Sequence, residues 1–149
     1  MEHHARIAWR NSGAPFTYEG YSRDHEWLFD STFRVNASSA PAFRGRSEVI
    51  DPEKGFVASL ASCHMLIFLS LAARKGWTVE SYEDNAVGTL EKNAEGRLSI
   101  TKVTLKPAVR FAPAISLPGS GVEMLHHQAH EQCFIANSVK TEVNVEPQF

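Results

Sequence analysis

The apolar and polar positions along the chain predict a strand-rich first third, followed by two helices with strands between and after them. Weak alternation and clustered aromatic residues predict short strands at 6–10, 16–18 and 26–29. Residues 36–46 are rich in Ser, Ala, Pro and Gly, which is typical of a surface loop. The first third therefore reads as strands that lead into a long loop.

The clearest helix signal covers residues 53–75. Asp51 is a good N-cap, Pro52 suits the first helical position, and Gly76 suits the position after the last turn. Between these ends the segment is apolar on nearly every face, so it should be buried on every face. A chain of this size buries such a helix with difficulty inside one copy, so we expect it at the centre of a homodimer.

The rest of the chain predicts a long hairpin, a second helix and a final strand. A turn at 93–96 separates the two hairpin segments, and the broken alternation of the second segment indicates a β-bulge. The expected elements are strands at 82–92 and 98–111, a loop at 113–121, a helix at 122–137 and a strand at 141–145. The order β-β-(β)-α-β-β-α-β predicts an α+β fold with a mainly antiparallel sheet, in a single domain over 1–149.

Composition limits the possible partners and compartment. The chain has 149 residues, 43% hydrophobic and 21% charged, with a formal net charge of −2. Such a weak charge predicts no nucleic-acid partner and no anionic membrane surface. The first ten residues lack a signal-peptide pattern, and the apolar run 65–73 is short for a bilayer span. We therefore expect a cytoplasmic protein, in which structural disulfides are rare.

The two cysteines are the candidate chemistry. Cys63 lies mid-helix, ten residues after Glu53, which places the two about 15 Å apart along the axis. Glu53 could therefore reach only the Cys63 of an antiparallel partner helix. A reactive Cys63 must ionise, and Arg44 or Arg46 in the preceding loop is placed to supply a stabilising cation. Cys133, on the expected second helix, could come within disulfide range of Cys63.

Histidines offer two alternative sites. His127, His130 and Cys133 follow one another at three-residue spacing, which can align zinc ligands on a helix. No second cysteine pair or carboxylate cluster completes a tetrahedral set nearby, so we expect no metal. His64 directly follows Cys63, but adjacent helical side chains point about 100° apart. We therefore expect His64 to be a core or interface residue rather than the base for Cys63.

These motifs resemble the OsmC/Ohr proteins, the osmotically inducible and organic hydroperoxide resistance proteins, and look nearer to the OsmC-like branch. The resemblance rests on Asp51-Pro52-Glu53 with Cys63 ten residues later, on strand residues 100–105, and on Cys133 before a last strand. It extends over residues 4–146. It implies an OsmC-like fold, in which an antiparallel sheet wraps two long core helices within an intertwined homodimer.

The resemblance also implies an activity, that of a cysteine-based, peroxiredoxin-like peroxidase acting in the stress response. Cys63 would be the peroxidatic cysteine and Cys133 the resolving cysteine, with no cofactor and no metal. Glu53 would orient an arginine at the thiolate, with Arg44 as first candidate and Arg46 or Arg23 as alternatives. The substrates would be organic hydroperoxides, with hydrogen peroxide reduced more slowly. An external dithiol, on a lipoyl protein or a thioredoxin-like protein, would restore the thiols.

One residue departs from the family pattern and keeps other functions open. Phe134 follows the second cysteine, where the family usually has a proline. One alternative is a catalytically weak relative that acts as a redox sensor or small-molecule binding module. Another is a structural dimer module with inert thiols.

Overall fold

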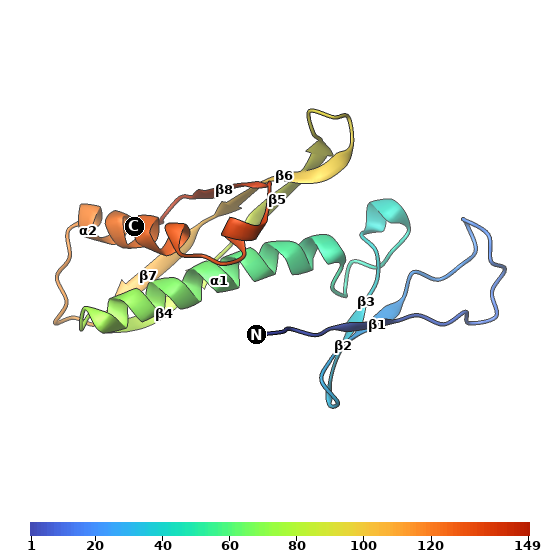
Figure 1. The fold of residues 1–149 in the computed structure, drawn as a ribbon, viewed down its shortest axis with the longest axis horizontal. Coiled ribbons are helices and arrows are strands. Elements are labelled where there is room, and N and C mark those ends of the chain that lie inside the picture. Colours follow the sequence, from blue (N-terminus) through green and yellow to red (C-terminus); the bar gives the residue numbers. More distant parts are fainter. The chain divides into compact units, whose positions relative to one another are not determined.

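The computed structural model describes all 149 residues (Figure 1). The chain forms two compact units, Met1–Gly55 and Phe56–Phe149. Helix α1, Pro52–Arg74, begins in the first unit and continues in the second. The single domain expected over 1–149 stays a prediction.

The first unit contains a three-stranded antiparallel sheet of order β1-β2-β3. Asp30 makes the tight turn between the last two strands. It adopts a left-handed conformation with φ 57°, and its carboxylate accepts hydrogen bonds from the backbone N–H groups of Thr32 and Phe33. The elements of this unit are β1 (Arg6–Ala8), β2 (His25–Phe29), β3 (Phe33–Ala37) and the short 3₁₀ helix η1 (Pro41–Phe43).

The structure of this unit differs from the prediction in two places, a predicted strand that does not form and a strand that was not predicted. Residues 16–18 form no strand, because local bonds fold the chain into turns there: the N–H of Gly20 binds both the carbonyl and the hydroxyl of Thr17. Strand β3 was not expected, since its burial alternates weakly and only Ala37 is fully buried. Its first residues pair with β2 through the Asp30 turn, a pairing that the hydrophobic pattern does not encode.

Helix α1 has the predicted caps. The carboxylate of Asp51 accepts a hydrogen bond from the N–H of Lys54 at 2.8 Å. At the other end, Gly76 has a φ of 71°. The N–H groups of Gly76 and Trp77 bind the carbonyls of Ala73 and Ala72, which is a Schellman motif. Local sequence therefore sets both ends of this helix.

The predicted hairpin of the second unit is confirmed, but each long strand is broken once. Asn93 shapes the turn by accepting hydrogen bonds from the N–H groups of Glu95 and Arg97. The expected bulge lies at Thr101, since Thr89 pairs with Lys102 whereas Leu90 pairs with Ile100. The hairpin strands are β4 (Val79–Asp84), β5 (Val87–Lys92), β6 (Leu98–Leu105) and β7 (Pro107–Phe111).

The last strand pairs in parallel with the hairpin. Strand β8, Glu142–Val145, lies beside β6 in a three-stranded sheet of order β5-β6-β8. Strands β4 and β7 pair antiparallel in a second sheet. The mainly antiparallel α+β class is therefore confirmed, with β6–β8 as the one parallel strand pair.

The second helix ends earlier than predicted. Helix α2 covers Gly119–Glu131, and a 3₁₀ helix η2, Ala136–Ser138, follows it. Asn137 folds back and donates its side-chain amide to the carbonyl of Glu131 at 3.0 Å. This bond caps the helix at that point. The spacing of apolar residues over 122–137 does not reveal such a bond.

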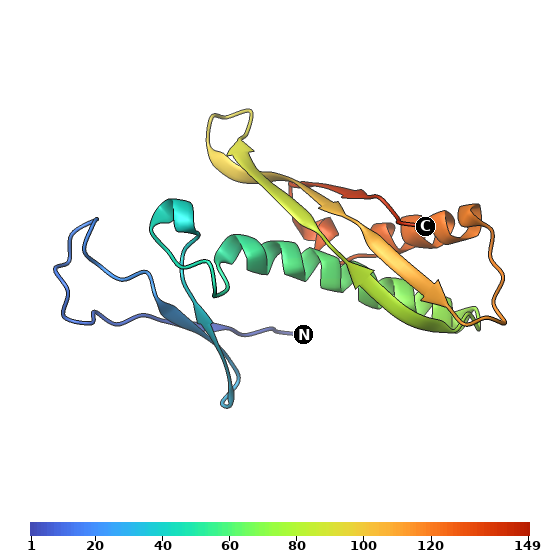
Figure 2. The same cartoon turned by 180° about the vertical axis from the view of Figure 1, so that it is seen from behind.

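The core of the second unit lies between the sheets and the two helices. Figure 2 shows the β4–β7 pair crossing α1 on one side, and both views show α2 next to α1. Phe68 and Ala72 of α1 pack against Leu125 and Ala129 of α2. Leu60 packs against Val103 and Leu105 of β6.

Helix α1 is also the one helix whose length and composition would allow a membrane crossing. Its most apolar 18-residue window has a mean hydropathy of 2.0, so the apolar stretch is longer than the run 65–73 indicated. The core helix of a soluble protein passes the same test.

Candidate functional site

Cys63 lies on the flank of the buried stripe of α1. Leu60, His64, Phe68 and Ala72 form that stripe at four-residue spacing and are fully buried. Cys63 immediately precedes His64 and is half-buried. Its sulfur is therefore placed at the edge of the core.

Cys133 lies in the turn after α2, not on the helix as predicted. Its side chain is 1% exposed, and its sulfur accepts a hydrogen bond from the N–H of Ala136 at 3.5 Å. The backbone carbonyl of Cys133 accepts from the N–H of Asn137 at 3.0 Å. The turn that starts η2 thus fixes the cysteine from both its backbone and its side chain.

The two cysteines are free thiols and lie close enough for Cys63 to raise the pKa of Cys133. Burial raises the pKa of Cys133 to about 11, and the neighbouring sulfur of Cys63 adds to that rise. A protonated Cys133 can donate its S–H to the sulfur of Cys63. The second unit therefore brings together the two cysteines singled out in the sequence, seventy residues apart.

Glu53 and the three candidate arginines belong to the first unit. Glu53 is half-buried in the first turn of α1 and makes no ion pair or side-chain hydrogen bond, so none of the three arginines pairs with it. Because Cys63 belongs to the other unit, an arginine held over its sulfur stays a prediction.

The three arginines differ in how they are held. Arg44 is exposed in a left-handed conformation after η1, with its guanidinium 5.4 Å from the ring centroid of Tyr18. Arg46 is neutralised by ion pairs to Asp24 at 3.2 Å and Glu48 at 2.9 Å, and these bonds raise its pKa. Arg46 lines a pocket that also contains Asp24 and Glu26.

Arg23 is the most firmly positioned of the three. Its guanidinium lies 3.7 Å from the ring centroid of Tyr21 and donates to the carbonyls of Tyr18 and Tyr21, both at 2.6 Å. The plane of the guanidinium is thus held by stacking and by two hydrogen bonds.

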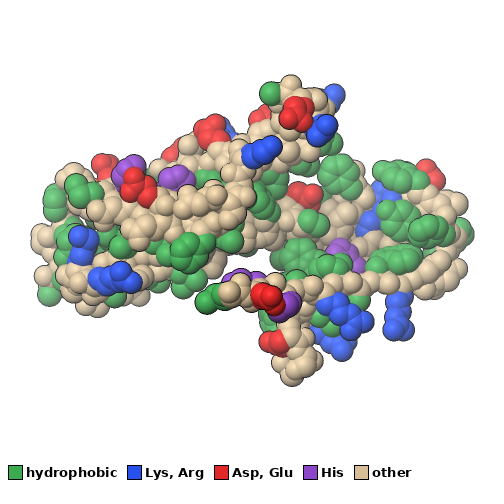
Figure 3. All heavy atoms as spheres, in the orientation of Figure 1, with side chains coloured by type: hydrophobic (Ala, Val, Ile, Leu, Met, Phe, Trp, Pro, Cys, Tyr) green, Lys and Arg blue, Asp and Glu red, His purple; other side chains and the backbone are tan.

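Arg23 lines an aromatic pocket of about 540 Å³ within the first unit. Trp9, Phe16 and Tyr21 pack against one another there, with ring centroids 5.5–6.3 Å apart. Figure 3 shows hydrophobic side chains gathered over this segment between β1 and β2. Ser38 also lines the pocket, and its buried hydroxyl has no hydrogen-bond partner. Such a pocket suits an apolar molecule with one polar group.

Sequence reasoning missed a buried histidine pair in the second unit. Nε2 of His64 and Nδ1 of His126 lie 3.0 Å apart, and both side chains are buried. Burial lowers the pKa of His64 to about 3 and that of His126 to about 4, so both rings are neutral near pH 7. The core position expected for His64 is confirmed. The signal for His126 was its place on the apolar stripe of α2, beside Leu125.

The residues considered as alternative zinc ligands do not form a metal site in the structure. No three His, Cys, Asp or Glu side chains in the chain form a group that could hold a metal ion. His127 is exposed and lies 3.4 Å from Glu131, its neighbour one turn along α2.

Comparisons with known proteins agree with this fold. The model of the family described as OsmC-like protein matches residues 45–148. An OsmC-like protein of unknown function from Vibrio cholerae is 46% identical, with 99% of each chain covered and a TM-score of 0.95. Among curated proteins no sequence matches.

Two more distant structures share the fold. An organic hydroperoxide resistance protein from Legionella pneumophila is 19% identical, with a TM-score of 0.68 over 99% of this chain and 95% of its own. One from Bacillus subtilis is 20% identical, with a TM-score of 0.68 over 97% and 98%. The chain therefore has the OsmC fold, and it belongs to the OsmC-like protein family.

Proposed function

We propose that this protein is a thiol peroxidase that reduces organic hydroperoxides through Cys63 and Cys133. The observation that carries the proposal is the proximity of the two free thiols in a member of the OsmC-like family. The names of the Legionella and Bacillus proteins support an organic hydroperoxide as substrate.

The proposed reaction has two steps on the enzyme. The Cys63 thiolate attacks the outer oxygen of the hydroperoxide, the O–O bond breaks, and the leaving alkoxide takes a proton to become an alcohol. Cys63 is then a sulfenic acid. The thiol of Cys133 attacks that sulfur and water leaves, which forms a disulfide. An external dithiol, on a lipoyl or thioredoxin-like protein, reduces the disulfide and is itself oxidised.

We propose that the aromatic pocket beside Arg23, within the first unit, binds an apolar organic group. Its rings supply apolar surface, and the firmly held guanidinium offers hydrogen-bond donors. Glu53, with Arg44 or Arg46 in place of Arg23, completes the set of candidates. The positioning of Arg23 favours it over the other two.

A homodimer is part of this proposal. The most apolar window of α1 is only 22% buried, and Leu66 on that helix is 59% exposed. Figure 3 shows hydrophobic side chains at the surface over α1. An exposed apolar helix of this length is typical of an interface between two copies. A cytoplasmic location would keep the thiols reduced between turnovers.

The deciding experiment is turnover of cumene hydroperoxide by the reduced protein with dihydrolipoamide. Wild type is expected to consume peroxide, and Cys63→Ser is expected to lose this activity. Arg23→Lys, Arg44→Lys and Arg46→Lys, compared in kcat/KM, identify the arginine that acts. The proposal is wrong if wild type consumes peroxide no faster than Cys63→Ser.

A redox sensor is the second candidate, favoured by the raised pKa of Cys133 and by Phe134 beside it. A sensor would form the disulfide once and turn over poorly. Intact mass after one equivalent of peroxide separates the cases: two hydrogens lost per chain without multiple turnover indicates a sensor. An unchanged mass indicates inert thiols.

A further inference from the structure

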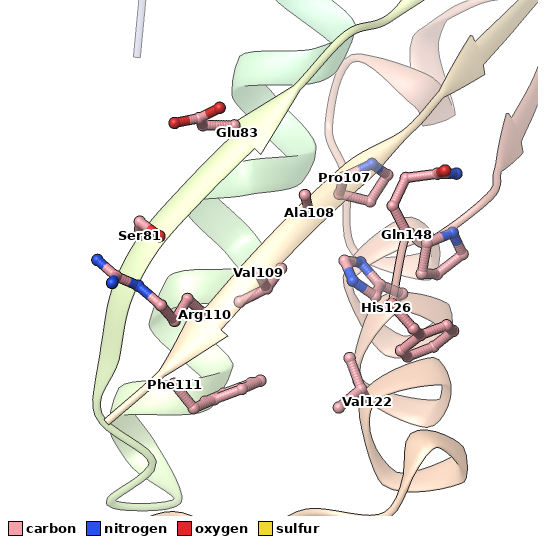
Figure 4. A pocket seen from close by; sticks show the side chains of 12 residues that line it. Ser81, Glu83, Pro107, Ala108, Val109, Arg110, Phe111, Val122, His126 and Gln148 are labelled. Carbon is pink, nitrogen blue, oxygen red and sulfur yellow. The ribbon is translucent and has the colours of Figure 1, made fainter. Parts of the chain in front are cut away.

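A second cavity lies in the unit Phe56–Phe149, apart from the cysteines. It has a volume of about 390 Å³, and residues of β4, β7, α2 and the tail 147–149 line it. We call it the β7–α2 cavity (Figure 4). Its volume is in the range of sites for small organic molecules.

His126 supplies a polar group to this cavity that nothing in the chain satisfies. Its side chain lines the cavity and is only 2% exposed. Nδ1 is occupied by the bond to His64, whereas the buried Nε2 has no hydrogen-bond partner. A buried polar atom of this kind is normally paired, so Nε2 marks where a ligand would bind.

The surroundings of His126 define the chemistry of that ligand. Figure 4 shows Phe111 and Val122 pointing toward one another across the gap between β7 and α2, while Arg110 and Glu83 point away from His126. Arg110 lies 3.4 Å from Glu80, so its charge is already paired. The charged side chains that line the cavity therefore lie away from His126, and the uncharged amide of Gln148 is the other polar side chain drawn beside it (Figure 4).

The protonation state of the His64–His126 pair indicates which polar group the ligand should carry. Burial keeps His126 neutral, so Nε2 either donates or accepts according to which ring holds the proton in the His64–His126 bond. A hydroxyl group can do both, and so it suits either tautomer. A carboxylate can only accept and would bring an unpaired charge into an apolar site.

We propose that the β7–α2 cavity binds a small uncharged aromatic molecule carrying one hydroxyl group, with the hydroxyl bonded to Nε2 of His126. The aromatic ring lies between Phe111 and Val122. The binding site is separate from the proposed peroxidase chemistry and does not depend on it.

The test is a titration of the full chain, with ¹⁵N-labelled histidine, with 4-methylphenol and with toluene as the matched molecule lacking the hydroxyl. We expect saturable binding of 4-methylphenol, with the largest shift at Nε2 of His126 and a smaller one at His64. Toluene should bind about tenfold more weakly, the difference one hydrogen bond makes.

Two variants complete the test. Val122→Trp fills the cavity and should abolish binding, whereas Met124→Trp, on the exposed side of the same helix, should leave it unchanged. Their ¹⁵N spectra without ligand show that both fold. The proposal is overturned by no saturable binding, by an unmoved His126 signal, by equal affinity for toluene, or by wild-type binding in Val122→Trp.

Discussion

At Cys133, burial and the neighbouring sulfur both act against ionisation. With a pKa of about 11, the side chain is a thiolate in about one molecule in ten thousand at pH 7. A thiol that is mostly protonated is a slow attacking group but a good donor to the sulfur of Cys63. The same proximity of the two thiols that supports the proposed peroxidase reaction therefore also limits its second step.

Disulfide formation should accordingly speed up with pH. After one equivalent of peroxide, the rate of conversion of the Cys63 sulfenic acid to the disulfide should rise about tenfold per unit between pH 7 and 9, with the thiolate fraction of Cys133. Rapid quenching followed by intact-mass analysis measures it. Cys133→Ser should accumulate the sulfenic acid. A flat pH profile in wild type would contradict thiolate attack by Cys133.

The histidine pair should make stability depend on pH. In the unfolded chain each ring binds a proton near its ordinary pKa of 6.5, whereas the folded rings do so only near 3 and 4. Between these values the unfolded state holds more protons, so stability is full above about pH 6.5 and falls as pH decreases toward 4. The slope approaches about 1.4 kcal/mol per pH unit for each histidine.

Urea unfolding between pH 7.5 and 5 measures this slope. The matched variant is His64→Leu with His126→Leu, which removes both partners at once and leaves no unpaired nitrogen in the pair. We expect the double variant to lose less stability than wild type on acidification. Equal pH slopes of the unfolding free energy in wild type and the double variant would show that the histidine pair does not cause the pH dependence.

At the scale of elements, the capped ends of α1 stabilise the helix that carries Cys63. Asp51 closes the first turn by accepting from Lys54, and Gly76 closes the last through its left-handed φ. Because Cys63 lies near the middle of this helix, fraying from either end reaches it last. The helix is therefore a firm support for Cys63, the nucleophile of the proposed reaction.

Removing the N-cap should destabilise the helix without touching the thiols. Asp51→Ala is expected to lower the free energy of unfolding by about 1 kcal/mol, since the N–H of Lys54 loses its acceptor. Asp51→Asn keeps an acceptor oxygen and serves as the control. Chemical denaturation of both variants measures the difference, and equal losses would mean that the charge rather than the cap matters.

At the scale of the whole molecule, the exposed apolar surface of α1 is the feature that one copy leaves uncovered. An apolar window that is 22% buried needs a further partner in water, and a second copy is the partner we propose. The peroxidase proposal also requires a second copy, because Glu53 and Cys63 are too far apart along one helix to meet within one chain.

A charge on this surface should therefore weaken the dimer. Leu66→Glu is expected to shift wild-type dimers toward monomers in sedimentation velocity, because a carboxylate would be buried at the interface. Leu98→Glu is the matched control, since Leu98 on the hairpin is equally exposed, at 60% against 59%. A monomeric wild type at micromolar concentration would refute the dimer.

The sequence by itself determined the features that depend on neighbours a few residues away. Asp51 and Gly76 bounded α1, Asn93 and Gly96 marked the hairpin turn, and the cysteine pair with Glu53 led to the family. These signals are local because caps and turns are hydrogen bonds between residues close in the chain.

Only the tertiary structure decided what lies next to what across long stretches of chain. It placed Cys63 near Cys133, paired His64 with His126, and set β8 parallel to β6. It also ended α2 before Cys133 through a bond from Asn137. Burial and packing between distant segments control these contacts, and one chain's hydrophobic pattern shows which residues are buried but not against which partners.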